Sequence, residues 1–128
     1  MRDIKFRFWD THRTCMVDWD YIKSAPMTHL ENEMSFPPMQ YTGLKDKNGK
    51  EIYEGDILKF IFKTKTKYPK GTIHYHEVVW NEVKAKWTLK RTDEKGNIHF
   101  VGLGKVDLKE HEIAGNSKEN PELLGGRK

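Results

Sequence analysis

Residues Met39–Ile57 have the sequence MQYTGLKDKNGKEIYEGDI, and this stretch decides the local architecture of the chain. Met39–Leu44 is rich in strand-forming residues, and Asn48-Gly49 is a dipeptide that tolerates positive φ and therefore suits a tight turn. The pattern predicts a β-hairpin. After the hairpin, Glu54-Gly55-Asp56 precedes the apolar run Ile57–Phe62. Because apolar residues occupy both alternating faces of this run, we expect a strand that is buried on both sides.

Strand-like patterns recur along the rest of the chain. In Ile4–Trp9 one set of alternate residues is entirely apolar, which is the period-two pattern of a strand with one face inward. Apart from the hairpin, the predicted strands are Ile4–Trp9, Met16–Asp18, Ile57–Phe62, Ile73–Trp80, Trp87–Arg91, Ile98–Val101 and His111–Gly115. Turn-forming residues at Asp93–Asn97 are expected to join two of these runs into a further hairpin.

Helical structure is expected in two short segments. Thr28 has a glutamate three residues later, which is the spacing of a capping box, and it is expected to begin a short helix. A final helical turn is expected over Lys118–Leu124, capped by Asn116 or Ser117. Pro121 then lies in the first turn, where its missing N–H costs little.

Length and composition place these elements in a single β-rich domain. A chain of 128 residues is long enough to bury roughly two-thirds of its unfolded surface. Six Phe, five Tyr and four Trp favour strands. Short turns between successive strands, without a long amphipathic helix, favour an antiparallel meander, and a partly closed small barrel, with SH3-like as one compatible form, would remove its edges. We expect one domain over residues 1–128, with residues 125–128 as a flexible tail.

Cysteine usage and hydropathy bear on the compartment. Cys15 is the single cysteine and cannot form an internal disulfide. The sequence has neither a signal-peptide pattern nor an apolar run long enough to span a membrane, so we expect a cytoplasmic protein. No Cys-His signature surrounds Cys15, which favours a strand or turn residue over a nucleophile.

The hairpin stretch closely resembles the signature of the YopX-like family, small proteins encoded mainly by bacteriophages and prophages, whose pattern runs QYTGLKDKNGKEIYEGDI. Met1–Asp10 is similar to the family's opening IKFRAWD, and Glu112–Asn116 with Glu119–Leu124 is similar to its closing EVIGNIYENPELL. Trp19–Pro38 and Lys63–Gly104 match no part of the pattern. The resemblance implies the cytoplasm of a bacterial host, and it supplies no established catalytic residues.

Histidines raise a metal hypothesis. His74 and His76 are two residues apart on a predicted strand, so they project to one face and could both reach a zinc ion. His99 on a neighbouring strand, or Glu77 at a bulge, could supply a third ligand. The sequence contains no Cys-x-x-Cys or His-Glu-x-x-His pattern. The favoured interpretation is a half-exposed strand face without a metal or cofactor.

Acidic residues raise a catalytic hypothesis. Glu51, Glu54 and Asp56 cluster around a turn, and paired carboxylates can act as general acid and base or hold a divalent ion. The favoured alternative is structural, with Asp56 accepting backbone hydrogen bonds at the entry to a strand. The serines lie outside any nucleophile elbow, and no phosphate-binding glycine loop is present. We therefore expect no catalytic residue and no enzymatic activity.

Positive charge is concentrated in one region. Lys63–Arg91 holds eight Lys and Arg against Glu77 and Glu82, while the rest of the chain sums to a net charge of −2. Alternating lysines on a strand face beside a tyrosine could contact phosphates and stack a base. The candidate nucleic-acid-binding residues are Lys63, Lys65, Lys67, Tyr68 and Lys70. The favoured interpretation is that these lysines keep an exposed strand edge soluble, and nucleic-acid binding is the alternative.

Four aromatic residues suggest self-association. Trp9, Trp19, Tyr21 and Phe36 lie in or beside segments too irregular to bury all of them in one barrel, so we expect some to line a patch covered by another copy. The predicted function is a non-enzymatic phage accessory protein that self-associates and contacts an unknown host or phage protein. The alternatives are a nucleic-acid-binding module and, less favoured, a metal-dependent hydrolase using His74 and His76.

Overall fold

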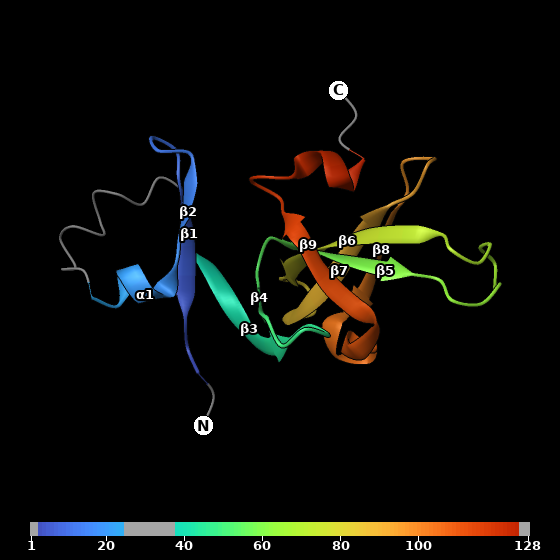
Figure 1. The fold of residues 1–128 in the computed structure, drawn as a ribbon, viewed down its shortest axis with the longest axis horizontal. Coiled ribbons are helices and arrows are strands. Elements are labelled where there is room, and N and C mark those ends of the chain that lie inside the picture. The colour runs from blue at the N-terminus through green and yellow to red at the C-terminus, as the bar shows by residue number, and fades with distance from the viewer. Residues whose placement is uncertain (1–2, 25–37, 126–128) are drawn as a thin grey trace.

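The computed structural model describes residues 3–24 and 38–125, which form two antiparallel β-sheets. Figure 1 shows β1, β2 and α1 at one side and the larger sheet at the other, with β3 and β4 between them. The smaller sheet has the order β2 (Cys15–Val17), β1 (Phe6–Asp10), β3 (Met39–Lys45) and β4 (Glu51–Tyr53). The larger sheet has the order β8 (Ile98–Gly102), β7 (Lys86–Thr92), β6 (Ile73–Asn81), β5 (Asp56–Ile61) and β9 (His111–Asn116). The helices are α1 (Trp19–Ile22) and the 3-10 turns η1 (Leu103–Lys105), η2 (Leu108–Glu110) and η3 (Pro121–Leu124).

The mainly β fold predicted from the sequence is confirmed, and the larger sheet curls into a half-barrel. Each predicted strand is present within two residues of its expected bounds. The sheet departs from a sequential meander at β9, which returns to pair with β5 instead of lying beside β8. Consequently β8 lies at one edge of the sheet. In the part of the chain that the structure describes, no helix is long and apolar enough to cross a membrane.

The hairpin predicted around Asn48-Gly49 is confirmed as β3 and β4. Gly49 has φ +80°, the left-handed conformation that a glycine adopts without steric cost. The buried side chain of Asp46 holds the turn by accepting from the backbone N–H groups of Asn48 and Lys50, each at 2.9 Å. Its second oxygen accepts from the N–H of Ile113 on β9 at 2.8 Å. The turn is therefore fastened to the half-barrel.

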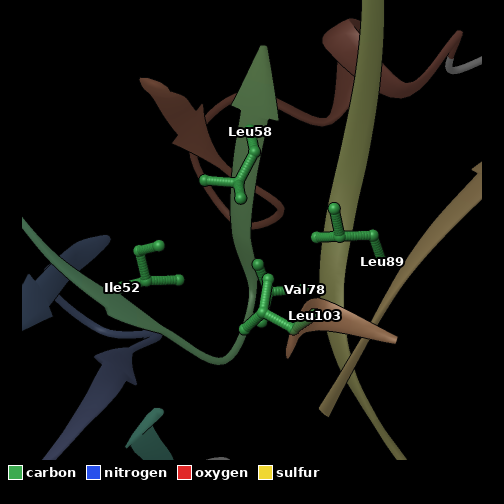
Figure 2. Close-up of a cluster of buried hydrophobic side chains, with 5 residues drawn as sticks. All are labelled: Ile52, Leu58, Val78, Leu89 and Leu103. Carbon is green, nitrogen blue, oxygen red and sulfur yellow. The ribbon is translucent and has the colours of Figure 1, made fainter. Parts of the chain in front are cut away.

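The main hydrophobic core lies at one end of the half-barrel and includes residues from both sheets (Figure 2). Its members are at most 1% exposed and are Ile52, Leu58, Val78, Leu89 and Leu103. Ile52 comes from β4, so the smaller sheet is anchored in this core. Burying a side chain of this kind contributes about 1.5–3 kcal/mol to stability.

Burial along β5 is uneven. Ile57 and Leu58 are both fully buried although they point to opposite faces, as expected. Further along, Phe60 is half-buried and Ile61 is 39% exposed, so the expectation of a strand buried on both sides is wrong for this half. The reason is that the core residues gather at the other end of the strand.

A second, smaller cluster holds β1, β2 and α1 together. Phe8 is fully buried and packs with Ile22, with Val17 and Trp19 around them. Helix α1 was not predicted, and Asp18 caps it by accepting from the N–H of Tyr21 at 3.2 Å. The helix expected at Thr28 lies outside the described residues.

The final helical turn is shorter than predicted. The 3-10 helix η3 begins at Pro121, with Asn120 as its N-cap, so the expectation that Asn116 or Ser117 caps this helix is wrong. Asn116 instead closes the turn before it, because its side-chain oxygen accepts from the N–H groups of Lys118 and Glu119 at 3.0 and 2.9 Å.

Candidate functional site

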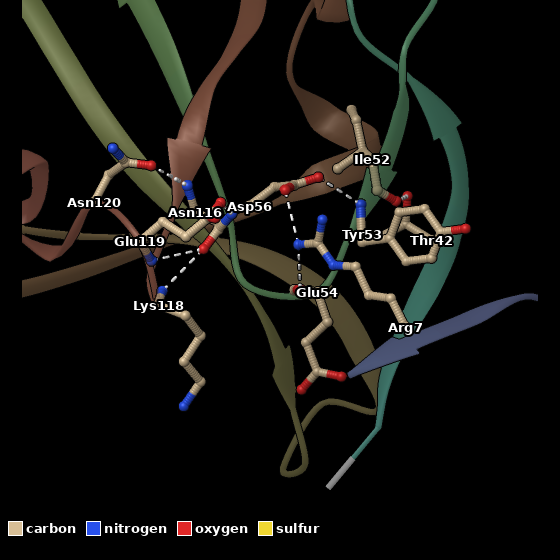
Figure 3. Close-up of polar contacts among 10 residues, drawn as sticks. All are labelled: Arg7, Thr42, Ile52, Tyr53, Glu54, Asp56, Asn116, Lys118, Glu119 and Asn120. Atoms are coloured by element: carbon tan, nitrogen blue, oxygen red, sulfur yellow. Dashed lines mark hydrogen bonds and ion pairs between the residues drawn. The ribbon is translucent and has the colours of Figure 1, made fainter. Parts of the chain in front are cut away.

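The acidic cluster around the signature turn forms part of a junction between the two sheets (Figure 3). Arg7 Nη2 on β1 donates to Asp56 Oδ1 on β5 at 2.8 Å and to the carbonyl of Glu54 at 3.1 Å. Asp56 Oδ2 accepts from the backbone N–H of Tyr53 at 2.8 Å, which is the role predicted for this carboxylate. The Arg7 guanidinium lies 4.9 Å from the centre of the Tyr53 ring.

The two charged side chains at this junction are buried, which indicates that they stabilise the fold. The side chains of Arg7 and Asp56 are 13% and 4% exposed. Burial raises the pKa of Asp56, and the positive charge of Arg7 and the N–H of Tyr53 oppose that rise. Figure 3 shows the Glu54 carboxylate directed away from Asp56, and Glu51 pairs with Lys5. The three acids therefore do not converge on one point.

Gly55 lies where the signature meets the end of the chain. Its φ is +89°, and a Cβ there would lie 3.3 Å from Met39 Sδ. Its N–H donates to the carbonyl of Val78, and its carbonyl accepts from the N–H of Ser117, both at 2.8 Å. Next to it, Asp56 pairs in register with Asn116. The opening, hairpin and closing segments that carry the family resemblance thus meet at one place.

The opposite end of the half-barrel carries a ring cluster. We call it the aromatic–histidine cluster, and it consists of Phe60, Phe62, Tyr68, His74, His76 and His111. Tyr68 packs on Phe62 and His74, with ring centres 5.1 and 4.5 Å apart. Apart from buried His111, its members are half-buried, so the cluster lies at the surface.

The predicted basic residues lie beside this cluster in the connection between β5 and β6, which projects from the sheet in Figure 1. The expectation that the lysines alternate on a strand face is wrong, because residues 62–72 form a loop in which all four lysines are exposed. Backbone hydrogen bonds between Phe62 and both Gly71 and Thr72 close the loop. Tyr68 anchors it, since its hydroxyl accepts from Arg91 Nη2 at 3.2 Å. Lys63 pairs with Glu110 at 2.9 Å.

Burial favours the uncharged form of two histidines of the cluster, His74 and His76. Burial, together with the neighbouring His111 and His74, lowers the pKa of His76 to about 4. Burial and Arg91 also lower the pKa of His74. His76 Nδ1 is buried and has no hydrogen-bond partner.

The proposed third metal ligands do not join them. His99 Nε2 lies 2.9 Å from Asp93, and Glu77 is in register between Ile57 and Lys90 on the other face. The rings of His74 and His76 are 6.0 Å apart. Among residues 3–24 and 38–125, no group of three or more His, Cys, Asp or Glu is arranged to hold a metal ion.

Comparison with known proteins places the chain in a family. Residues 26–125 match the family model described as YopX protein, and this is more than half of the chain. The protein belongs to the YopX family. This family is associated with bacteriophages and prophages, as the resemblance implied.

A solved structure resembles this YopX-family chain along nearly its whole length. The crystal structure of protein EF1440 from Enterococcus faecalis has a TM-score of 0.60 and 28% sequence identity, covering 97% of this chain and 99% of that one. No curated protein matches the chain in sequence. The shared architecture therefore extends over both sheets.

The residues predicted for self-association are dispersed. Trp19 packs against the Phe8 and Ile22 cluster, and Trp9 is half-buried on β1. Tyr21 is 41% exposed. Phe36 lies outside the described residues.

A more continuous apolar surface occurs on β8, which the sequence analysis did not single out. Ile98, Phe100 and Val101 are 54%, 53% and 37% exposed. Strand β8 is bonded to β7 on one side and lies at the edge of the five-stranded sheet. The sequence predicted the strand, but its edge position follows from β9 pairing with β5 instead.

Proposed function

We propose that this YopX-family chain is a non-enzymatic protein-interaction module that self-associates through the edge strand β8. The observation that carries the proposal is the exposure of Ile98 and Phe100 on an edge strand. Natural edge strands are commonly protected by a charged residue, a proline or a bulge. The sequence of β8, IHFVG, contains no Lys, Arg, Asp, Glu or Pro, and its pairing with β7 is regular. An edge of this kind is suited to pairing with another strand.

A second copy of β8 fits this edge by symmetry. Antiparallel pairing about a two-fold axis at Phe100 places the two Phe100 side chains side by side and sets Ile98 against Gly102 of the second copy. No charged side chain within the strand would be buried by this pairing. The small Gly102 leaves room for Ile98.

Charges at the two ends of β8 favour the same antiparallel arrangement. At the Ile98 end, the preceding turn carries Asp93, Glu94 and Lys95, with a net charge of −1. At the other end, the Lys86 and Lys105 side chains flank Gly102. Pairing about the two-fold axis brings the acidic end of one copy to the basic end of the other, which favours association and fixes its direction.

Support for a role without catalysis comes from the acidic residues. Asp56 is engaged in an ion pair between the two sheets, and Glu51 is paired with Lys5 at the smaller sheet. The association of the family with bacteriophages and prophages supports action in the cytoplasm of a bacterial host, where a host or phage protein is the further partner. An unrelated strand that pairs with β8 would use the same edge.

Two opposite charges at Phe100 test the interface. Light scattering of the unmodified chain at tens of micromolar should give the mass of two chains or more, and Phe100→Glu and Phe100→Lys should each give the mass of one chain. Mixing the two variants should restore the dimer, because opposite charges then meet at the axis. Val83→Glu, which adds a charge to a residue 93% exposed in another turn, should not change the mass.

A single-chain mass for the unmodified protein at these concentrations contradicts the proposal. Dimers that persist in both Phe100 variants also contradict it, since they would have to form through another surface.

A further inference from the structure

We infer that the basic loop between β5 and β6, together with the aromatic–histidine cluster, binds single-stranded nucleic acid. This site is separate from the unpaired edge of β8, because its residues lie on the β5–β6 loop and on β5, β6, β7 and β9, and β7 is bonded to the other side of β8. A negative result for nucleic-acid binding would therefore not count against self-association through β8.

The positively charged side chains of the loop would contact the phosphates. From Ile57 to His76 the chain has five lysines and no acidic residue. Lys65, Lys67 and Lys70 are exposed on the loop, and Arg91 reaches it from β7 by its bond to Tyr68. Lys63 is the exception, because its charge is balanced by Glu110. The remaining cations are spaced along a projecting segment, as contact with successive phosphates requires.

The rings below the loop provide stacking surfaces. Tyr68 and His74 are each partly exposed residues, and Tyr68 lies on the same loop as the lysines. Lys67 Nζ lies 5.7 Å and Arg91 Cζ 5.9 Å from the centre of the Tyr68 ring. A base that stacks here would have its phosphate within reach of these cations. Burial lowers the pKa of His74 and of His76, which favours uncharged rings that stack on bases without a desolvation cost for a charge.

Single strands are favoured over duplex for a geometric reason. Ring stacking requires unpaired bases, because in a duplex the base faces are covered by their neighbours. A duplex could still contact the lysines through its phosphates, but it would leave the rings unused. Sequence preference is expected to be weak, since every base has a face that can stack.

The test measures fluorescence anisotropy of an oligothymidylate of about 15 nucleotides, a length that spans one site of this kind, over a range of salt concentrations. Binding should be tighter than to a DNA hairpin of equal charge. Lys65→Gln with Lys67→Gln should reduce the salt-dependence slope by about 1.4, because each lost phosphate contact on a single strand contributes about 0.7. Lys45→Gln with Lys84→Gln removes the same charge from exposed positions on other elements and should leave the slope unchanged.

The ring contribution is tested separately. Tyr68→Leu keeps an apolar side chain against Phe62 and should weaken oligothymidylate binding about fivefold or more, with little change in the salt slope. Circular dichroism and thermal melting verify that each variant is folded, and Tyr68→Phe, which keeps the ring, should retain the affinity.

Three results would overturn the inference. The first is no binding of oligothymidylate at low salt. The second is equal affinity for the hairpin or heparin, which would show attraction to any polyanion. The third is an equal loss in the loop pair and the control pair of lysine variants.

Discussion

The two ends of the half-barrel differ in how their residues are used. At the end that holds the signature, the core residues are at most 1% exposed, and the charged pair of Arg7 and Asp56 lies between the sheets. At the other end, the rings are half-buried and the neighbouring lysines are exposed. One end therefore supplies stability, and the other leaves groups available for binding.

This contrast also explains why a family signature need not mark an active site. Tyr53, Gly55 and Asp56 belong to the signature, and each makes contacts that join the smaller sheet or the C-terminal segment to the half-barrel. Their chemistry is satisfied within the protein. The loop with Tyr68 lies outside the opening, hairpin and closing segments that resemble the family signature.

The largest effect is expected from the buried ion pair. Asp56→Ala should lower the free energy of unfolding by about 3–5 kcal/mol, because it leaves Arg7 buried without its partner. Urea denaturation measures this change. Asp20→Ala breaks an exposed pair with Lys23 and should cost only about 0–1 kcal/mol. Similar losses in the two variants would show that the inter-sheet junction is not a special source of stability.

The next effect compares two positions on one strand. Leu58→Ala should cost about 2–5 kcal/mol, since the side chain is fully buried in the core. Ile61→Ala, near the other end of β5, should cost about 1 kcal/mol or less because Ile61 is 39% exposed. The same denaturation experiment applies to both. Equal costs would contradict the uneven burial of β5.

Acid should destabilise the protein through His76, which lies in the aromatic–histidine cluster. The pKa of His76 is about 4 in the folded protein, whereas the ordinary value for histidine is 6.5. Between these two pH values the unfolded chain is protonated at His76 and the folded chain is not. The contribution of the uncharged His76 ring to the free energy of unfolding is therefore fully present above pH 6.5, and it is lost as the pH drops towards 4. His74, His111 and Arg91 face the ring and oppose its charge.

The size of this acid effect should be on the order of 3 kcal/mol. His76→Leu should remove most of it, as thermal melting across the pH range would measure. His12→Leu, at an exposed position in the turn between β1 and β2, is the control and should change the pH dependence much less than His76→Leu does. If His76→Leu melts with the same pH dependence as the unmodified chain, His76 is not the group responsible.

The smallest effect is expected at the hairpin turn. Gly49→Val should destabilise by about 1 kcal/mol or more, because Gly49 has φ +80° and no side chain with a branched Cβ adopts this conformation without strain. A Cβ added at Gly49 would have no other atom within 4 Å, so backbone strain is the expected cause. An unchanged melting temperature would contradict this explanation.

The sequence predicted what depends on local pattern. Alternating apolar residues and the Asn48-Gly49 turn identified the strands of the described residues and the signature hairpin. Long-range strand pairing could not be predicted in this way, because no local sequence pattern in β5 or β9 indicates that these two strands pair with each other. The edge position of β8 depends on that pairing, and so it was missed as well.

The candidate sites show the same division. The backbone role of Asp56 follows from its place beside a turn, whereas its partner Arg7 lies on a strand far away in the sequence. The basic loop was visible from its lysines. The hydrogen bond from Arg91 to Tyr68 could not be predicted from the sequence, because it depends on how β7 lies beside β6.

Amide hydrogen exchange at two protein concentrations tests the division between the two ends most directly. We expect the amides of Leu58, Val78 and Leu89 to exchange most slowly and those of the loop from Lys63 to Lys70 to exchange fast, and we expect β8 to gain protection as the protein concentration rises. Loop amides as protected as the core, or β8 amides that ignore concentration, would contradict this expectation.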